Sequence, residues 1–351
     1  MESTDVKARA RALGFELCGI ATADPQPELR FLADWLGRGY HGEMHYMART
    51  AERRLDPRAV LPSARSIVVL GAIYNTGAPA SLERVDPHAA LLSRYAWGDD
   101  YHDVLGSRLE QLEAWMRARC GPSFESRRYV DTGPVVERVA AGAAGLGWIG
   151  KNACLINPAL GSWLFLCEIL CSLPLEPDRP EPDRCGTCTL CIEACPTEAI
   201  VGDRVVDATR CISYLTIELK GSIPEALRGQ MGRHVYGCDI CQEVCPWNAD
   251  AVAAISRDAA WRPRAAFADA DLLRLWRMRD AELRQAITGT PMTRARVKRL
   301  RRNIAVAIGN CGDPSAAAVF DEPIDAPSIG DPLVQGHVTW ARAKLAATRH
   351  A

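Results

Sequence analysis

The sequence predicts a three-part α+β protein, in which an N-terminal domain of α/β type (residues 1–175) precedes a small cysteine-rich domain (176–260) and an all-α helical stack (261–351). Three observations predict this order. Strand and helix patterns are mixed before residue 175, eight of the 14 cysteines lie between Cys185 and Cys245, and helical periodicity dominates after residue 261. A length of 351 residues, with 48% hydrophobic and 24% charged residues, is typical of a globular protein of two or three domains.

The N-terminal part combines predicted helices with predicted strands. Residues 6–13 and 101–119 carry apolar side chains near i, i+4 spacing, which predicts helices. Residues 66–74 form a short, β-branched apolar run and are predicted to be a buried strand. Residues 128–131 and 163–170 are predicted strands as well. This mixture favours an α/β or α+β domain.

Two cysteine runs predict a ferredoxin-like domain with two 4Fe-4S clusters. Residues 185–196, CGTCTLCIEACP, reproduce the C-x2-C-x2-C-x3-C-P run of bacterial two-cluster ferredoxins. Residues 238–246, CDICQEVCP, match that run without its first cysteine, which Cys211 can supply. In such ferredoxins the fourth cysteine of each run ligates the other cluster. We therefore expect Cys185, Cys188, Cys191 and Cys245 on the first cluster and Cys195, Cys211, Cys238 and Cys241 on the second.

Structural zinc sites are the main alternative for these cysteines, since C-x2-C pairs are also typical of zinc ligands. The spacing disfavours zinc, because three cysteines at two-residue gaps are followed by a fourth and a proline. Disulfides are disfavoured further, because intracellular thiols stay reduced. The other six cysteines lack ligand spacing and are interpreted as free buried thiols: Cys18, Cys120, Cys154, Cys167, Cys171 and Cys311.

Charge and hydropathy favour a cytoplasmic monomer without a membrane partner. No apolar run approaches the roughly 18 residues of a membrane span, and the first ten residues, MESTDVKARA, contain no apolar stretch of a signal peptide. The net charge is -1, so a nucleic-acid partner would need a local basic patch.

The C-terminal part supplies such a patch. Four prolines between residues 174 and 182 mark a linker into the cysteine-rich domain, and the chain turns helical after residue 261. Leu300, Ile304, Ala307 and Ile308 fall on one face of a predicted helix, and Arg294, Lys298, Arg301 and Arg302 on another. A second helix at 332–347 suggests a short stack resembling HEAT repeats. Six cationic residues among nine would repel one another unless an anion lies against them, so we expect contact with nucleic-acid phosphates rather than a merely solvated face.

Two glycine-containing motifs give weaker signals. Residues 145–152, GLGWIGKN, contain G-x-G-x-x-G and nearly match a P-loop, but the preceding segment is helical where nucleotide motifs require a strand. We expect these glycines to let the backbone approach another large cofactor, with Lys151 beside it. Residues 100–106 resemble the D-x-H-x-x-G signature of histidine-ligated cobalamin proteins, but Gly106 comes one position late. His102 is therefore interpreted as a capping or surface residue.

Asp131 ends the predicted strand RRYVD and precedes Thr132, Gly133 and Pro134. Catalytic groups are frequently held by turns at strand ends. From these residues alone, a turn or helix-capping role is favoured over a catalytic one.

Several ordered blocks together resemble the epoxyqueuosine reductase family. They include residues 129–152, the two cysteine runs, CISYLTIELKG at 211–221, SRYAWGDDYH at 93–102 and GTPMTRARVKRLRRNIAVAIGN at 289–310. The resemblance covers nearly the whole chain. It implies a cobalamin-dependent oxidoreductase with two 4Fe-4S clusters, which converts epoxyqueuosine in tRNA to queuosine in the last step of that synthesis.

The resemblance also implies roles for particular residues. Asp131 matches the proposed proton donor, and this role requires burial that raises its pKa above ~3.9. Cobalamin is expected base-off, without a histidine ligand, and the role of Asp99 is open. The candidate cobalamin contacts are Arg54, Lys151, Asn152 and Ser213. The candidate tRNA contacts, which would grip the anticodon stem-loop, are Arg294, Lys298, Arg301 and Arg302.

Two other functions fit part of the sequence. A ferredoxin-like electron carrier would need neither the 175 residues before the clusters nor the basic C-terminal helix. A corrinoid reductive dehalogenase would share the cobalamin and cluster domains, but the basic helical end and the absence of an export signal favour tRNA. Electrons would come from an external low-potential donor.

Overall fold

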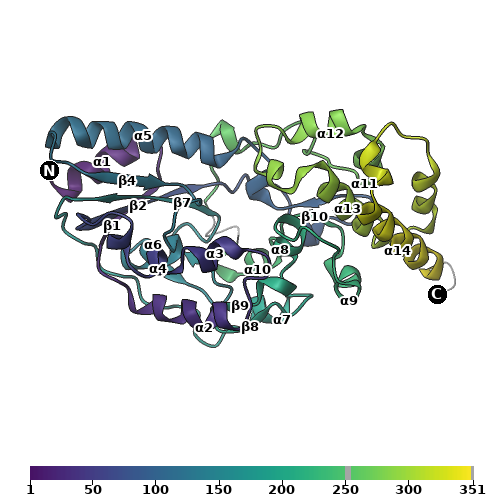
Figure 1. Ribbon diagram of the computed structural model, residues 1–351, viewed down its shortest axis with the longest axis horizontal. Coiled ribbons are helices and arrows are strands. Elements are labelled where there is room, and N and C mark those ends of the chain that lie inside the picture. Colours follow the sequence, from purple (N-terminus) through teal and green to yellow (C-terminus); the bar gives the residue numbers. More distant parts are fainter. Residues whose placement is uncertain (250–253, 349–351) are drawn as a thin grey trace.

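A computed structural model describes residues 1–249 and 254–348 of the chain (Figure 1). The molecule is elongated, with the N-terminus at one end and the helical C-terminal part at the other. Residues 250–253 of the predicted cysteine-rich domain and 349–351 of the predicted helical stack lie outside the described residues.

A four-stranded sheet forms the centre of the N-terminal half, in the order β1 (Leu17–Thr22), β2 (Ser66–Ile73), β7 (Leu164–Cys171) and β4 (Ser126–Tyr129). Each neighbouring pair is antiparallel. The predicted α+β class is therefore confirmed, whereas the α/β type predicted for residues 1–175 is wrong, because the sheet lacks parallel pairing. The strand predicted at 128–131 is shifted, so Asp131 lies in the turn after β4.

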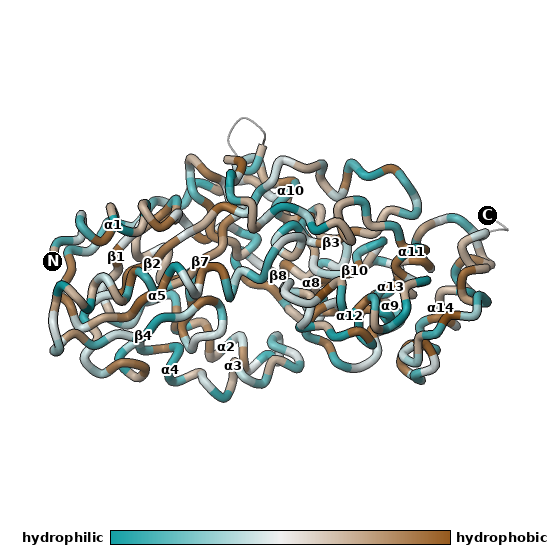
Figure 2. Tube along the Cα trace, turned by 90° about the horizontal axis from the view of Figure 1, so that it is seen from above, coloured by the Kyte–Doolittle hydropathy of each residue, from teal (hydrophilic) through white to brown (hydrophobic). Residues whose placement is uncertain are grey.

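Both faces of this sheet are covered, by α1 (Ser3–Ala12) and α5 (Tyr101–Cys120) on one side and α6 (Glu137–Ala143) on the other. Val68 and Leu70 of β2 pack with the first pair of helices, and Ile67 and Val69 pack with α6. Alternate side chains of a strand point to opposite faces, so a strand covered on both sides requires an unbroken apolar run. The hydropathy of β2 and β7 follows this rule (Figure 2).

Short elements complete the N-terminal half and the cysteine-rich region. In the N-terminal half they are α2 (Phe31–Gly37), α3 (His45–Arg49), α4 (Ala51–Leu55), β5 (Trp148–Ile149) and β6 (Leu155–Ile156). In the cysteine-rich region they are α7 (Leu190–Glu193), β8 (Ile200–Gly202), β9 (Val205–Val206), α8 (Ile212–Ile217), α9 (Glu225–Arg228), β10 (His234–Tyr236) and α10 (Ile240–Glu243).

The C-terminal part is helical, with α11 (Leu272–Arg277), α12 (Asp280–Ile287), α13 (Arg296–Gly309) and α14 (Pro332–Thr348). α13 is the central helix of this part, and every residue from Leu300 to Gly309 is buried. The predicted helical character and the helix near 332–347 are confirmed. The predicted HEAT-like repeat stays a prediction. The segment between the two long helices α13 and α14 contains a 3-10 helix, Pro314–Asp321, in place of a further α-helix.

One segment links the two halves of the molecule. Leu91–Leu92, which form β3, pair in parallel with β10 from the cysteine-rich region. Leu92, Ala96 and Trp97 belong to the same apolar core as α11 and α13. The chain thus crosses from the sheet domain to the C-terminal core and returns at α5, a connection that local sequence patterns do not predict.

Candidate active site

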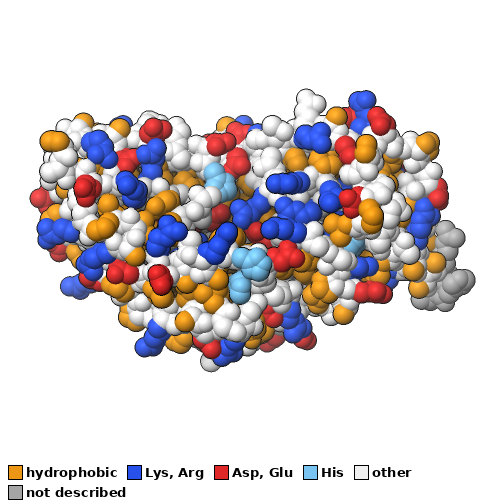
Figure 3. Space-filling model, in the orientation of Figure 1, with side chains coloured by type: hydrophobic (Ala, Val, Ile, Leu, Met, Phe, Trp, Pro, Cys, Tyr) orange, Lys and Arg blue, Asp and Glu red, His pale blue; other side chains and the backbone are white. Residues whose placement is uncertain are grey.

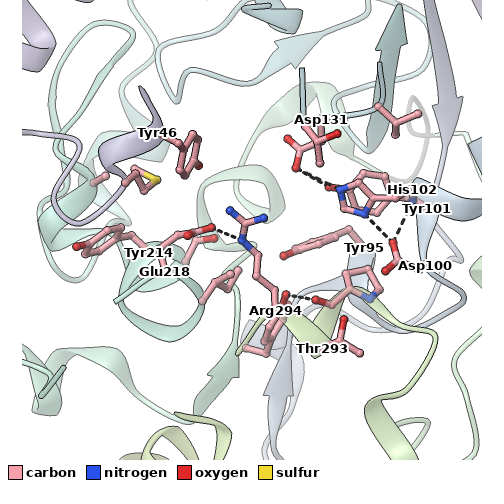
Figure 4. Close-up of a pocket in the computed structure, with 18 of the residues that line it drawn as sticks. Tyr46, Tyr95, Asp100, Tyr101, His102, Asp131, Tyr214, Glu218, Thr293 and Arg294 are labelled. Atoms are coloured by element: carbon pink, nitrogen blue, oxygen red, sulfur yellow. Dashed lines mark hydrogen bonds and ion pairs between the residues drawn. The ribbon is translucent and has the colours of Figure 1, made fainter. Parts of the chain in front are cut away.

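A cavity of about 1460 Å³ opens between the sheet domain, α8 and the start of α13 (Figure 4). This volume exceeds the 300–1,000 Å³ typical of pockets for drug-sized ligands. Asp131 and His102 lie on one side, and Arg294 points into the cavity beside Glu218 on the other. Six tyrosines line it: Tyr46, Tyr95, Tyr101, Tyr129, Tyr214 and Tyr236.

The turn after β4 aims Asp131 at this cavity. Asp131 has a φ of 57°. This left-handed backbone conformation is uncommon for residues other than glycine, although Asn, Asp and His adopt it more often than the rest. Its N–H donates to Glu137 Oε1 at 2.6 Å, and Tyr101 Oη donates to its Oδ2 at 3.0 Å. The side chain is 51% exposed, so the carboxylate stays accessible from the cavity.

His102, in the first turn of α5, lies beside Asp131. Its Nδ1 is 2.7 Å from Asp100 Oδ1, and its Nε2 is 3.5 Å from Asp131 Oδ2. Asp100 also caps α5 by accepting from the His102 backbone N–H. The capping role near this helix start belongs to Asp100, and His102 instead connects two carboxylates. The sequence did not predict that His102 lies between two carboxylates. The one local indication was Asp100, an acidic residue two positions before His102.

These contacts set the charges in the site. Burial disfavours a charged His102, but hydrogen bonds to Asp100 and Asp131 outweigh it and raise the pKa of His102 to about 9. Burial favours a protonated Asp131, but its hydrogen bonds with His102 and Tyr101 lower the pKa of this carboxyl below its usual value. The expectation of a raised Asp131 pKa is therefore wrong, because His102 supplies an opposite charge.

The cysteine runs converge in two groups that mix residues from both runs. Burial and the neighbouring Cys185 and Cys191 raise the pKa of Cys245 to about 11. Burial raises the pKa of Cys211 and Cys238, and Cys195 adds to both shifts. The fourth cysteine of each run thus lies beside the other run, as a crossed ligand set requires.

The surroundings of the two groups fit iron–sulfur clusters. Trp148 Nε1 lies 3.5 Å from Cys185 Sγ, and the Ala199 N–H donates to Cys195 Sγ at 3.3 Å. Hydrogen bonds to cluster sulfurs are among the groups that set reduction potentials. Among the described residues, no three His, Cys, Asp or Glu side chains are grouped tightly enough to hold a single metal ion.

Only one of the four candidate cobalamin contacts, Ser213, lines the cavity. Arg54 is buried and donates to the Val135 carbonyl at 2.9 Å. Lys151 pairs with Asp203 at 3.8 Å, and Asn152 donates to the Cys241 carbonyl at 3.1 Å. These three side chains serve the fold around the cavity and do not line it.

The glycines of residues 145–152 also serve the protein interior. A Cβ on Gly145 would lie 2.5 Å from the Arg179 carbonyl oxygen, and one on Gly147 would lie 2.1 Å from that of Ile156. Backbone, not a cofactor, fills the space that these glycines leave. The expectation of a cofactor approach at this loop is therefore wrong.

The predicted basic face of α13 divides into an exposed and a buried part. Arg294 lines the cavity and pairs with Glu218 at 2.6 Å, and Lys298 also lines it, with a half-exposed side chain 3.1 Å from Asp331. Arg301 and Arg302 are fully buried. Arg302 donates to the carbonyls of Leu219 and Gly221 at 2.8 and 2.6 Å.

The placement of Arg301 and Arg302 among the tRNA contacts is therefore wrong. The reason is that α13 is surrounded on all sides from Leu300 onward, so Arg301 and Arg302 donate to backbone carbonyls of neighbouring segments. Arg296 and Arg299, which the sequence analysis did not select, line the cavity instead. Figure 3 shows Lys and Arg side chains gathered near the middle of this face of the molecule.

Comparisons with known proteins identify the family. Residues 54–132 match the family described as "Epoxyqueuosine reductase QueG, DUF1730", and residues 184–248 match a 4Fe-4S double cluster binding domain. The chain is 45% identical to the epoxyqueuosine reductase of Gloeobacter violaceus over 90% of this chain and 98% of that protein. It is 40% identical to that of Salmonella typhimurium over 99% of this chain and 89% of the relative.

The chain belongs to the epoxyqueuosine reductase family.

Solved members of the epoxyqueuosine reductase family share the fold. One, crystallised with an epoxyqueuosine-modified tRNA-Tyr stem loop, is 30% identical, with a TM-score of 0.86 over 97% of this chain and 89% of that chain. The Bacillus subtilis enzyme, in a form with its catalytic aspartate loop swung out of the active site, is 29% identical, with a TM-score of 0.84 over 97% of this chain and 90% of that one. Membership of this family decides against the electron carrier and the dehalogenase.

Among the described residues, no helix is long and apolar enough to cross a membrane.

Proposed function

We propose that this protein reduces epoxyqueuosine to queuosine at the wobble position of tRNA, with base-off cobalamin and two 4Fe-4S clusters. One observation carries the proposal: Asp131, the basic residue Arg294 and Cys211, an expected ligand of the second cluster, line a single cavity. A proton source, an electron source and an anion-binding group are thereby available to one substrate. Removal of the epoxide oxygen as water consumes two electrons and two protons, and two one-electron clusters can supply those electrons.

The cavity fits a large, flat cofactor. Its volume exceeds that of ordinary ligand pockets, and its tyrosines and Ser213 offer apolar faces with polar edges. When bound, cobalamin would supply the metal centre through which electrons reach the epoxide. Both nitrogens of His102 face carboxylates, which supports cobalamin without a histidine ligand.

The His102–Asp131 pair supplies the acid. At neutral pH the proton resides on His102, whose Nε2 faces Asp131 Oδ2. Both side chains line the cavity, and Asp131 is the more exposed, so it passes a proton to the departing oxygen while His102 restores it. Tyr101 fixes the carboxylate by donating to the same oxygen atom.

The basic rim binds the nucleic acid. Arg294 and Lys298 lie at the mouth of the cavity, with Arg296 and Arg299 beside them. Phosphate contacts from such residues would hold an anticodon stem-loop while a wobble nucleotide, turned out of its stack, enters the cavity. The related enzyme crystallised with a modified stem loop supports this part of the proposal.

The direct test is turnover by the fully loaded protein. Anaerobically reconstituted protein, given cobalamin, a chemical reductant and tRNA carrying epoxyqueuosine, should form queuosine detectable by mass spectrometry of the nucleosides. Protein without cobalamin is the control. Full cofactor content without queuosine would refute the proposed function.

The base-off state has its own measurement. The electron paramagnetic resonance spectrum of the Co(II) form should lack nitrogen splitting from an axial ligand, and His102→Gln should leave it unchanged. A nitrogen-split signal that disappears in this variant would make His102 the cobalt ligand.

A further inference from the structure

Glu168 is an acidic residue in the middle of an apolar sheet. It lies on the central strand β7, opposite Val69 of β2 and Tyr129 of β4, and none of its surface is exposed. Its face of the strand also carries Leu166 and Leu170, which pack against α6. Burial of an ionised carboxylate is costly unless it is paired, so this position requires an explanation.

Helix α6 packs on β7, and the carboxyl of Glu137 at the start of α6 is the side chain that acts most strongly on Glu168. No N–H or O–H donor of the described residues reaches either oxygen of Glu168. Two carboxyls in hydrogen-bond contact need a proton between them, because ionised carboxylates only accept. A fully buried carboxyl that no donor reaches, beside a second carboxyl, is therefore expected to hold a proton.

Glu137 also contacts the proposed proton donor. Its Oε1 accepts the Asp131 N–H at 2.6 Å, and this bond holds the turn in which Asp131 adopts a left-handed conformation. One carboxyl of the buried pair thus anchors the catalytic turn. The other, Glu168, is anchored by the central strand of the sheet.

The charges around this pair do not replace the proton. Arg54 is the nearest cation from α4, but its guanidinium donates to Thr50 Oγ1 and the Val135 carbonyl. Arg138 of α6 donates to the Ala153 carbonyl. The other titratable groups that interact with the pair are Asp131, Tyr101, Tyr129 and the buried Cys167 beside Glu168 on β7. Burial first, and then the neighbouring carboxylates, raise the pKa of Glu168 well above its usual range and that of Glu137 to about 7.

We propose that Glu137 and Glu168 form a carboxyl pair that holds one proton and thereby positions the Asp131 turn for catalysis. With the proton in place, Glu137 bonds Glu168 and the Asp131 N–H together. After its loss, two buried negative charges face each other beside Asp131, and their repulsion releases the turn. This inference rests on the proposed function for the role of Asp131, but the shared proton exists without it.

Glu137→Gln isolates the contribution of the proton. The amide oxygen still accepts the Asp131 N–H, and the amide nitrogen donates to Glu168, so the variant imitates the protonated pair at every pH. Glu137→Ala removes the anchor altogether. In single-turnover reactions at neutral pH, Glu137→Gln should stay within about threefold of the parent rate, whereas Glu137→Ala should be at least tenfold slower.

An infrared measurement separates this inference from the proposed function. Protein without tRNA should show the stretch of a buried protonated carboxyl at pH 6, and the signal should disappear in Glu168→Gln. If the parent makes no queuosine but this signal is present, the proposed function fails and the shared proton stands. An active parent without the signal, or a Glu137→Ala variant with the parental rate, would overturn the inference.

Discussion

In the proposed function the carboxylate of Asp131 and the imidazole of His102, with Oδ2 and Nε2 3.5 Å apart, act as one acid. The nearer hydrogen-bond donor to Asp131, Tyr101 Oη, orients the carboxylate at 3.0 Å. Proton donation therefore depends on three side chains, two of which are adjacent on α5.

Asp131→Asn should reduce single-turnover queuosine formation by ~100-fold or more, because an amide cannot act as the same acid. Binding of tRNA, measured by filter retention, should be unchanged. The matched control is Asp99→Asn, since Asp99 lies outside the cavity and pairs with Arg264 at 2.8 Å. We expect less than about a threefold effect there. Equal rates for Asp131→Asn and the parent would return Asp131 to a structural role.

His102→Gln should change the alkaline limb of the pH profile. The pKa of His102 is raised to about 9, so the imidazolium is available below that pH and the parental rate falls above it. The single-turnover rate of His102→Gln should be lower than that of the parent at pH 7 and should not decline above pH 9.

The same shift predicts a pH effect on stability. A pKa raised in the folded protein contributes stability that is fully present below ~6.5 and is lost as pH rises through about 9. Chemical denaturation at pH 6 and pH 9.5 should show a larger loss of unfolding free energy in the parent than in His102→Gln. An equal loss in both proteins would contradict the His102 assignment.

At the scale of elements, α13 performs two tasks with arginines of the same chemistry. Its first turn and the preceding 3-10 helix, Pro291–Ala295, line the cavity with exposed cations. The following turns are the centre of the C-terminal core, where Arg301 stacks on Trp276 and donates to backbone carbonyls.

The double variant Arg294→Gln and Lys298→Gln should weaken tRNA binding and flatten its salt dependence by roughly 0.7–0.9 in log-log slope per lost contact. Its unfolding free energy should change by no more than about 0.5 kcal/mol per site, because both side chains are partly exposed. Filter binding between 50 and 200 mM salt, conditions over which phosphate contacts change affinity strongly, provides the measurement. An unchanged slope would move the tRNA surface elsewhere.

Arg302→Gln is the buried counterpart of that variant. Burial lowers the pKa of Arg302 to about 9, and three backbone carbonyls depend on its guanidinium. We expect a loss of about 2–4 kcal/mol in unfolding free energy, because buried acceptors lose their donors. For the folded fraction of the variant, the dependence of tRNA affinity on salt concentration should be the same as in the parent protein. A stable variant with a reduced slope would instead place Arg302 at the tRNA surface.

At the scale of the whole molecule, the cluster region joins the sheet domain to the C-terminal core. Asn152 of the sheet domain donates to the Cys241 carbonyl, and the cavity is shared by all three parts. Crossed ligation makes each cluster depend on both cysteine runs.

Cys195→Ala tests this crossing. The variant should lose the second cluster, to which Cys195 contributes from the first run, and keep the first. Anaerobically reconstituted parent should contain about eight irons and eight sulfides, and the variant about four of each. Cys211→Ala should lose the same cluster, whereas Cys120→Ala, remote from both runs in the sequence, should keep both. Loss of the first cluster in Cys195→Ala would show that each run fills its own site.

The sequence by itself determined the double cluster domain and the family, because cysteine spacing and ordered sequence blocks are local features of the chain. The two cysteine runs predicted a double cluster domain, and the β-branched run of β2 predicted a strand covered on both faces. Helix α5 was also predictable, since its apolar spacing is regular.

Only the tertiary structure decided which side chains share a cavity. The shift of the Asp131 pKa depends on His102 from another element, and the burial of Arg301 and Arg302 depends on segments packed around α13 from distant parts of the chain. Helical periodicity distinguishes the faces of a helix but not how many of them are covered. The shared proton of Glu137 and Glu168 has the same origin: a sequence separation of 31 residues becomes a contact only when α6 packs on the sheet.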